Sequence, residues 1–272
     1  MAKSTGSKFW RILVGILVAL LVLLIVAEIG LRWFVGQQVR DSFDQQVQEQ
    51  GITVEEDPEI SFGATPLLFG LLGSSISQVE MSTPSTLEIN YPDGENSVPE
   101  IEGAPAATVN LESLDISDPD NPVAQTMVTT TQIPEDMILA MIQRETAGQS
   151  GDSQDTGFGA AILQQLVQVT NVTTDPANNA LDIEFTGGAA ILSLEPVLSN
   201  GGLTFQVIGA ELFGMDLPEQ VTGAITSALE QGVQDATGDL EITAFDVVDG
   251  AVEVTIRGEN VPLGEVASQS GI

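Results

Sequence analysis

The chain has 272 residues, a formal net charge of −32 and neither cysteine nor histidine. The two missing residue types exclude disulfides, thiol catalysis, histidine-ligated zinc and Ser-His-Asp triads, so we expect no cofactor and no metal site. The excess of acids argues against a nucleic-acid partner, because neutralising phosphates requires Lys and Arg, and against docking on anionic lipid by surface charge.

Positive and negative charges are segregated along the chain. Five basic residues and one acidic residue give residues 1–40 a net charge of +4, whereas two basic and 38 acidic residues give the remainder −36. The basic residues of the first part flank an uncharged apolar run, Ile12 to Ala27. This pattern predicts a membrane anchor followed by an acidic soluble domain.

The predicted anchor is a transmembrane helix over residues 9–34. Ile12 to Ala27 alone spans only about 24 Å as a helix, which is shorter than the roughly 30 Å hydrocarbon core. Phe9-Trp10 and Trp33-Phe34 extend the helix at both ends and suit the two headgroup layers. Glu28 and Arg32 are four residues apart, so they can pair on a helix and lower the cost of charge at the outer end.

The orientation follows from the basic residues that precede the apolar run. They predict a cytoplasmic tail over residues 1–8 and a single-pass plasma-membrane protein whose main domain is extracytoplasmic. A cleaved signal peptide is the alternative, because a basic start and an apolar run fit both. Ala27-Glu28-Ile29-Gly30 is a poor cleavage site, which favours the uncleaved anchor.

After the anchor, residues 35–50 predict an amphipathic stalk helix that ends at Gly51. Its apolar stripe consists of Val35, Val39, Phe43 and Val47. The stalk either docks on the domain or, alternatively, associates with a second copy. We place the domain at residues 51–264 and a short tail at residues 265–272.

The domain begins with a predicted strand over residues 52–62, which leads into the most apolar stretch outside the anchor. This stretch is too short to span a membrane and too apolar for an exposed loop. It is either a core helix, or the apolar mouth of a lipid-sized pocket or a segment that dips into the bilayer. The candidate lipid-binding residues are Phe62, Pro66, Leu67, Leu68, Phe69, Leu71 and Leu72.

Several short strands are predicted next, namely Ser77 to Met81, Thr86 to Tyr91, Ala107 to Leu111 and Gln125 to Thr131. Pro92 to Pro105 is rich in Pro, Gly and Glu and predicts a connection. Thr146 to Gly157 contains no apolar residue larger than Ala and predicts a mobile loop.

An internal repeat is predicted from the two halves of the domain. Residues 132–137 resemble residues 216–221, and each segment opens a helix with Pro and Glu in its first turn. Each helix is followed by two alternating strands, over 167–172 and 181–187 in the first unit.

The second unit of the repeat has its strands over 240–245 and 252–258, joined by the tight turn Asp249-Gly250. Strict alternation of apolar and polar residues predicts an antiparallel sheet with one solvated face. The fold class is therefore α+β, with a curved antiparallel sheet wrapped around amphipathic helices.

Few charged groups qualify as site residues. Arg144 and Arg257 are the only cations after residue 40, so either is a candidate to bind a phosphate headgroup, or else forms a structural ion pair. Two carboxylates can cleave glycosides, but among 38 acids close pairs arise by chance. Trp is absent after residue 33 and Tyr91 is the only tyrosine, which disfavours a carbohydrate site.

The domain resembles the actinobacterial LmeA-like phospholipid-binding proteins, a family named for lipomannan elongation and maintenance. The motifs that carry the resemblance are Pro66-Leu67-Leu68 with Gly73 and Val79, Leu111-Glu112-Ser113-Leu114, Leu194-Glu195-Pro196 with Asn200-Gly201-Gly202, Leu217-Pro218, and Val248-Asp249-Gly250 with Val254 and Gly258-Glu259-Asn260-Val261. They cover nearly all of the chain after the anchor. This chain departs from the family in its acidity and in the loop at 146–157.

The resemblance implies an envelope protein that binds phospholipid and supports lipoglycan synthesis or maintenance, rather than an enzyme. It also implies a fold like the tubular lipid-binding domains and suggests envelope glycosyltransferases as partners. Two other hypotheses stay open at this point. One is a solid-cored scaffold for envelope enzymes, and the other is a carboxylate-dependent glycoside hydrolase.

Overall fold

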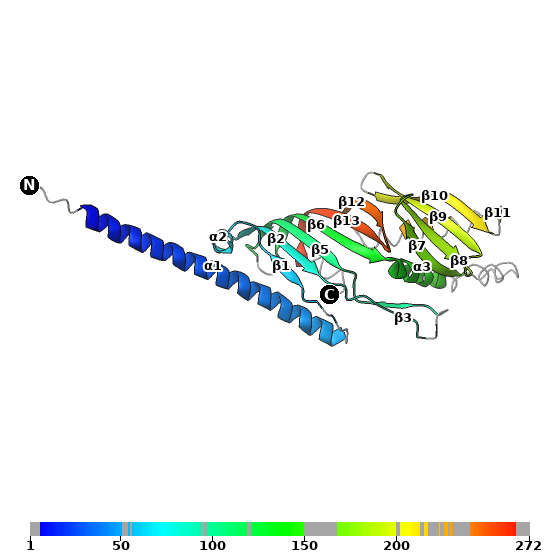
Figure 1. The fold of residues 1–272 in the computed structure, drawn as a ribbon, viewed down its shortest axis with the longest axis horizontal. Helices are drawn as coiled ribbons and strands as arrows, with labels where there is room; N and C mark the ends of the chain where they lie inside the picture. Colours follow the sequence, from blue (N-terminus) through cyan, green and yellow to red (C-terminus); the bar gives the residue numbers. More distant parts are fainter. Residues whose placement is uncertain are drawn as a thin grey trace, which may run out of the picture.

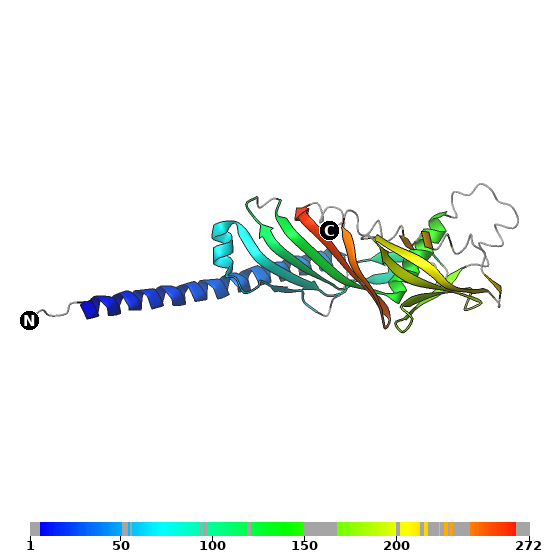
Figure 2. The same ribbon diagram turned by 90° about the horizontal axis from the view of Figure 1, so that it is seen from above.

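The computed structural model describes residues 6–50, 54, 56–92, 94, 97–118, 121–149, 168–199, 202–212, 215–216, 223, 226–227, 229–230 and 240–264. These residues form an elongated α+β molecule whose strands all pair antiparallel (Figures 1 and 2). The predicted loop beyond residue 149, Gly51, the tail at 265–272 and most of the predicted second helix lie outside the described residues.

One continuous helix, α1 (Gly6–Gln50), joins the predicted anchor to the predicted stalk. Its 45 residues rise about 67 Å, and no proline interrupts them. In Figures 1 and 2 the first half of α1 projects beyond the domain, while the second half runs alongside it. Among the side chains that are described, an 18-residue stretch within Leu21–Gln45 has a mean hydropathy of 1.4, and 6% of it is buried. This length and composition suit a membrane span or a signal sequence.

A six-stranded sheet forms the half of the domain next to α1. Its strands are, in spatial order, β1 (Glu59–Ser61), β2 (Ser75–Thr83), β5 (Ala107–Asp115), β6 (Val123–Pro134), β13 (Ala251–Pro262) and β12 (Glu241–Val248). Alternation sorts the side chains onto two faces. Met81 pairs with Val109 on the apolar face, whereas Ser82 pairs with Thr108 on the polar face.

A five-stranded sheet forms the far end. It consists of β11 (Met215–Asp216), β10 (Gly202–Leu212), β9 (Ala190–Ser199), β8 (Ala180–Phe185) and β7 (Val169–Asp175). This sheet packs against β12, where the rings of Phe205 and Phe245 meet edge to face at 6.2 Å. The domain therefore contains two large sheets instead of the single curved sheet that we expected.

The remaining elements cover edges of the two sheets. Helix α2 (Leu67–Gly73) contacts α1 and β2, and helix α3 (Glu135–Gln149) contacts β6 and β7. The short strands β3 (Glu88–Asn90) and β4 (Glu100–Glu102) form a hairpin that reaches α3.

Two clusters of buried apolar side chains lie at opposite ends of the domain. We call the cluster between the five-stranded sheet, α3 and β12–β13 the distal core; its members include Val172, Leu181, Ile183, Phe185, Leu192 and Leu194. We call the cluster next to α1 and α2 the proximal core; it contains Phe62, Leu67, Val79, Leu114, Ala124, Met127 and Val261. Leu31 and Val35 of α1 pack against the proximal core, so the anchor helix is part of the folded domain.

The hairpins β7–β8 and β12–β13 share one irregularity. The strand register shifts between Val169 and Asn171 in the first and between Ile242 and Ala244 in the second. In each, the threonine at the bulge donates its hydroxyl to a carbonyl of the partner strand, Thr170 to Glu184 at 3.4 Å and Thr243 to Thr255 at 3.2 Å. The predicted helix–strand–strand repeat stays a prediction, because few residues of its second helix are described.

Several boundaries differ from expectation. Of the described residues in the predicted strand over 52–62, only Glu59–Ser61 form a strand, and the predicted connection from Pro92 to Pro105 contains β4. Helix α3 continues from Thr146 to Gln149, which we expected in a loop. The Thr146 hydroxyl donates to the carbonyls of Ile142 and Gln143, so this polar residue is accommodated within the last turns of the helix.

Candidate functional site

The apolar segment that the sequence marked as a lipid site divides into a buried and an exposed face. Phe62 and Leu67 are buried in the proximal core, whereas Leu68 is half-buried and Pro66 is exposed. Phe69, Leu71 and Leu72 point outward, with 61%, 49% and 86% of their surfaces exposed. The segment is thus neither a fully buried core helix nor a polar surface loop.

Close packing beneath α2 produces this division. Gly70 lies so near the start of β2 that a Cβ there would stand 2.9 Å from the Ser75 carbonyl oxygen. Ser74 then ends the helix in a left-handed conformation, with φ of 53°. Because Leu67 and Gly70 are three residues apart, they face the core together, and the larger side chains between and after them turn away.

A charged pair on α1 holds the start of α2. The Glu28 carboxylate accepts hydrogen bonds from the backbone N–H groups of Leu67, at 2.8 Å, and Leu68, at 3.1 Å. Arg32 donates to Glu28 at 2.6 Å, as the predicted spacing of four allows. We call these contacts the helix clamp.

Arg32 extends the clamp to the loop between β1 and α2. Its guanidinium donates to the carbonyl oxygens of Phe62 at 2.7 Å, Gly63 at 3.2 Å and Thr65 at 3.1 Å. One cation and one anion therefore satisfy five backbone groups of this loop and of the first turn of α2. Charge-assisted bonds of this kind are about twice as strong as neutral ones, so α2 has a defined position relative to α1.

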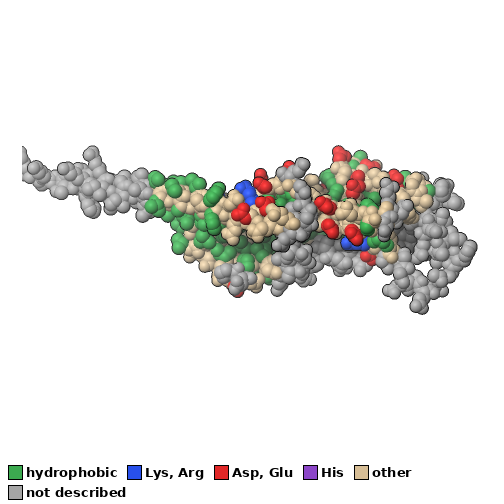
Figure 3. Space-filling view, turned by 90° about the horizontal axis from the view of Figure 1, so that it is seen from below, with side chains coloured by type: hydrophobic (Ala, Val, Ile, Leu, Met, Phe, Trp, Pro, Cys, Tyr) green, Lys and Arg blue, Asp and Glu red, His purple; other side chains and the backbone are tan. Residues whose placement is uncertain are grey.

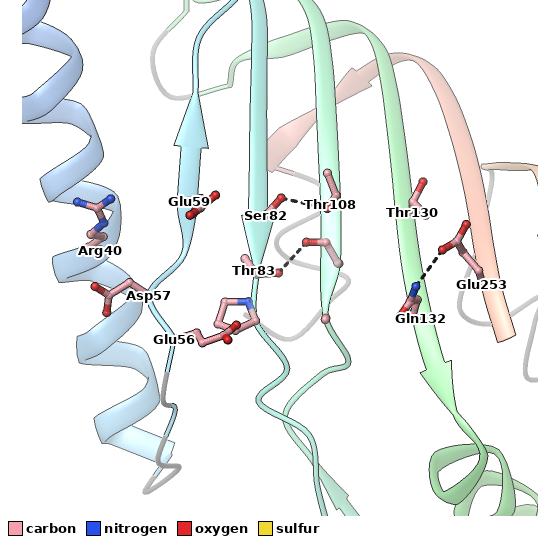
Figure 4. Close-up of a pocket in the computed structure, with 13 residues that line it drawn as sticks. Arg40, Glu56, Asp57, Glu59, Ser82, Thr83, Thr108, Thr130, Gln132 and Glu253 are labelled. Atoms are coloured by element: carbon pink, nitrogen blue, oxygen red, sulfur yellow. Dashed lines mark hydrogen bonds between the residues drawn. The ribbon is translucent and has the colours of Figure 1, made fainter. Parts of the chain in front are cut away.

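A groove lies on the polar face of the six-stranded sheet (Figure 4). It has a volume of about 750 Å³ and runs from α1 across β1, β2, β5 and β6 to β13. Its polar lining consists of Arg40, Glu56, Asp57, Glu59, Ser82, Thr83, Thr108, Thr130, Gln132 and Glu253. Several of these groups bond to one another; Ser82 and Thr108 share a hydrogen bond of 3.0 Å, and Gln132 donates to Glu253.

This polar groove does not suit an acyl chain or an anionic headgroup, because it offers hydroxyls and four carboxylates against one arginine. It also does not suit glycoside hydrolysis. The proton donor in that reaction is a desolvated carboxyl group, whereas Glu56, Asp57 and Glu59 are exposed.

The opposite face of the same sheet carries most of its apolar side chains, with Thr129 and Thr131 of β6 among them. Near α1 it presents Val79 and Leu111, which pair directly, and Met127 follows on β6. Farther along β13 it presents Ile256 and Val254, and there it merges with the distal core. Met81, Val109, Leu111 and Ile256 are only half-buried, so this apolar face is less completely covered than the core at the far end.

The two arginines suggested for a headgroup are on different parts of the domain. Arg144 is exposed on α3. Arg257 lies on the polar face of β13, where it pairs with Glu259 at 3.5 Å across exposed surface. Neither residue belongs to α2 or to the segment that leads into it.

A smaller cavity of about 430 Å³ lies between the β3–β4 hairpin and α3, with Leu87, Ile89, Tyr91, Pro134 and Asp136 in its lining. Burial raises the pKa of Tyr91, and the charge of Asp136 raises it further. The tyrosine hydroxyl donates to the Gln143 side chain at 3.1 Å, which gives it a structural role. Within the described part of the chain, no group of three or more Asp and Glu side chains has the arrangement of a metal site.

The geometry defines a class of protein, namely an acidic α+β domain with one apolar sheet face and an apolar helix beside a candidate membrane span. Comparison with known families gives the particular one: residues 26–257 match the model described as LmeA-like phospholipid-binding, and the chain belongs to this family. No curated protein and no solved structure gave a significant match.

Proposed function

We propose that this protein is a membrane-tethered phospholipid-binding protein that holds or passes lipid acyl chains outside the plasma membrane. Helix α1 is the uncleaved anchor, with the amino terminus in the cytoplasm and the domain on the extracytoplasmic side. Three basic residues before the apolar run support this orientation. The family gives the ligand class, phospholipid.

The observation that carries the proposal is the half-covered apolar face of the six-stranded sheet. It begins at α2, beside the anchor, and continues to the distal core. We place the acyl chains on this face, with the segment from Phe62 to Leu72 as its mouth. A chain buried there gains about 0.8 kcal/mol per CH₂, so affinity does not require surface cations.

The headgroup contributes less to binding in this proposal. The domain is strongly acidic, and the candidate cations Arg144 and Arg257 lie away from α2. We therefore expect selection by acyl chain more than by headgroup charge. Family membership suggests a wider role for such a carrier, which performs no catalysis itself. This role is to support lipoglycan synthesis, with envelope glycosyltransferases as partners.

Photo-crosslinking in liposomes tests the proposal on the full chain. The phospholipid carries a diazirine near the end of one acyl chain, and mass spectrometry locates the adducts. We expect adducts on Met81, Val109 or Leu111, which belong to the sheet and not to α1 or α2. Adducts confined to α1 and α2 would reject the carrier function and favour a solid-cored scaffold.

Two matched substitutions control the experiment. Leu111→Gln places an amide on the apolar face and should lower the yield of sheet adducts at least fivefold. Glu112→Gln places the same amide one residue later, on the exposed polar face, and should leave the yield unchanged. Equal yields from both variants would contradict the assigned face.

A further inference from the structure

The exposed side of α2 is the most apolar surface of the folded domain. Among the described residues after α1, Leu72 and Phe69 are the most exposed large apolar side chains. From Ser61 to Val79 the sequence contains no charge, although 38 acids follow residue 40. On the face drawn in Figure 3, hydrophobic side chains likewise gather at the end next to α1, whereas acidic ones lie farther along. A contiguous apolar surface of this kind marks a binding surface.

The helix clamp fixes where this surface lies along α1. Glu28 bonds the first turn of α2, so α2 begins at the level of Glu28. The uncharged apolar run of α1 ends at Ala27, so Glu28 is the first charged residue after the part of the helix that would cross the hydrocarbon core. The clamp thus lies at the boundary between the hydrocarbon and the headgroups of the membrane that α1 would span.

The direction of α2 also suits this boundary. In Figure 2 the α2 ribbon runs across α1 at the end of the domain nearest the projecting anchor. A helix perpendicular to a membrane span is parallel to the membrane plane, which is the orientation of interfacial helices. Trp33 and Phe34, both exposed, lie about 8 Å farther along α1, where headgroups end and aromatic belts occur.

We infer that α2 is a second membrane contact, which inserts Phe69, Leu71 and Leu72 into the outer leaflet beside α1. The inference rests on the proposed tether, because the occupant is the bilayer that α1 spans. It adds that the domain does not swing on its anchor. The clamp and α2 hold the proximal end of the apolar sheet face against the leaflet, so a lipid can move between them without crossing water.

A single fluorescent probe measures the depth of α2. The chain has no cysteine, so Leu72→Cys can be labelled with an environment-sensitive nitrobenzoxadiazole in the full-length protein in phosphatidylcholine–phosphatidylglycerol liposomes. Val207→Cys on β10 is the matched control, since Val207 is also apolar and exposed. We expect blue-shifted emission at residue 72 and at least twofold quenching by lipids spin-labelled high in the acyl chain, with no quenching at residue 207. Equal emission and quenching at both positions would overturn the inference.

The clamp is tested separately in the same liposomes. Arg32→Gln removes the donor to three carbonyls and should at least halve the quenching at residue 72. Arg40→Gln removes a positive charge from the same helix away from α2 and should not change it. Unchanged quenching in the Arg32→Gln protein would overturn the positioning role of the clamp, and circular dichroism checks that each variant is folded.

The outcomes separate this inference from the proposed function. Quenching at residue 72 without lipid adducts on the sheet leaves the membrane contact in place and rejects lipid carriage. Sheet adducts without quenching at residue 72 support lipid carriage and reject the membrane contact.

Discussion

The end of the domain next to α1 and the end formed by the five-stranded sheet are both antiparallel, but they bury their apolar side chains differently. In the distal core nine of the sixteen buried side chains are at most 2% exposed, although Phe205, Val247 and Val254 reach 8%. Among the described residues of the proximal core, the large side chains retain between 3% and 8% of their surface, and many neighbours are half-buried.

The two ends therefore contribute differently: the distal end mainly stabilises the fold, and the proximal end keeps apolar surface for binding. A sheet, α3 and the β12–β13 hairpin enclose the distal end, so its apolar side chains are buried and stabilise the fold. The proximal end keeps apolar surface on α2 and on the sheet that the described protein atoms do not fully cover. A lipid-binding protein needs such surface. Burial of apolar side chains in the distal core offsets the free energy that this exposed surface costs.

The largest predicted effect compares one leucine from each end. Leu192→Ala should lower the free energy of unfolding by about 2–5 kcal/mol, because it leaves a cavity in a fully buried site. Leu111→Ala should cost only about 1–2 kcal/mol, because Leu111 is half-buried. Thermal and urea unfolding of the full chain in detergent micelles, followed by circular dichroism, measure both. Equal losses of unfolding free energy would show that the two leucines are buried to the same extent.

A smaller effect compares the two bulges. Thr243→Val removes the hydroxyl bond to Thr255, whereas Thr170→Val removes the bond to Glu184 and also the bond that the hydroxyl accepts from the Gly187 N–H at 3.0 Å. Both substitutions keep the side-chain shape, so each lost bond should cost about 0.5–1.5 kcal/mol in the same unfolding assay. Thr170→Ser and Thr243→Ser keep the hydroxyl and should cost less. A large loss at one bulge and none at the other would argue against the predicted repeat.

The smallest effect compares an exposed aspartate at one end with a half-buried aspartate at the other. The Asn178 side chain, which donates at 2.6 Å, and nearby backbone N–H groups lower the pKa of Asp175, while Ser117 lowers the pKa of Asp115. Since these values lie below those of the unfolded chain, the stabilisation is present above the ordinary aspartate pKa of about 3.9 and is lost as pH falls through the lowered value.

Carboxyl-carbon NMR titration measures both aspartates in one sample. Asn178→Ala should raise the pKa of Asp175 toward its ordinary value and leave that of Asp115 unchanged. If Asp175 titrates identically with and without the Asn178 side chain, that side chain does not lower its pKa.

The sequence predicted the features that depend on local pattern. The apolar run with its flanking charges predicted the helix at 9–34, and strict alternation predicted the strands around Asp249-Gly250, which form the expected hairpin. The spacing of Glu28 and Arg32 predicted their pair. In each case the residues that determine the structure are near one another in the chain.

Features that depend on distant residues could not be predicted in this way. The backbone partners of Glu28 are 39 and 40 residues away, so the clamp was invisible in the sequence. Composition identified the segment around α2, but its exposed side depends on the approach of Gly70 to Ser75.

Strand β9 was not predicted, and it contains Pro196, a residue that is rare in central strands. Pro196 pairs with Phe205 of β10, but β8 pairs with β9 only as far as Leu194, so Pro196 has a paired strand on one side only.

The unbroken course of α1 has a mechanical consequence. Its residues after Glu28 rise about 33 Å beside the domain without a proline, and Gly36 packs against Ile60 instead of forming a bend. If α1 spans the membrane as we propose, a tilt of the anchor is transmitted to the whole domain. The protein itself then sets the distance between the leaflet and the five-stranded sheet, and an acceptor of lipid would have to reach the domain at that distance.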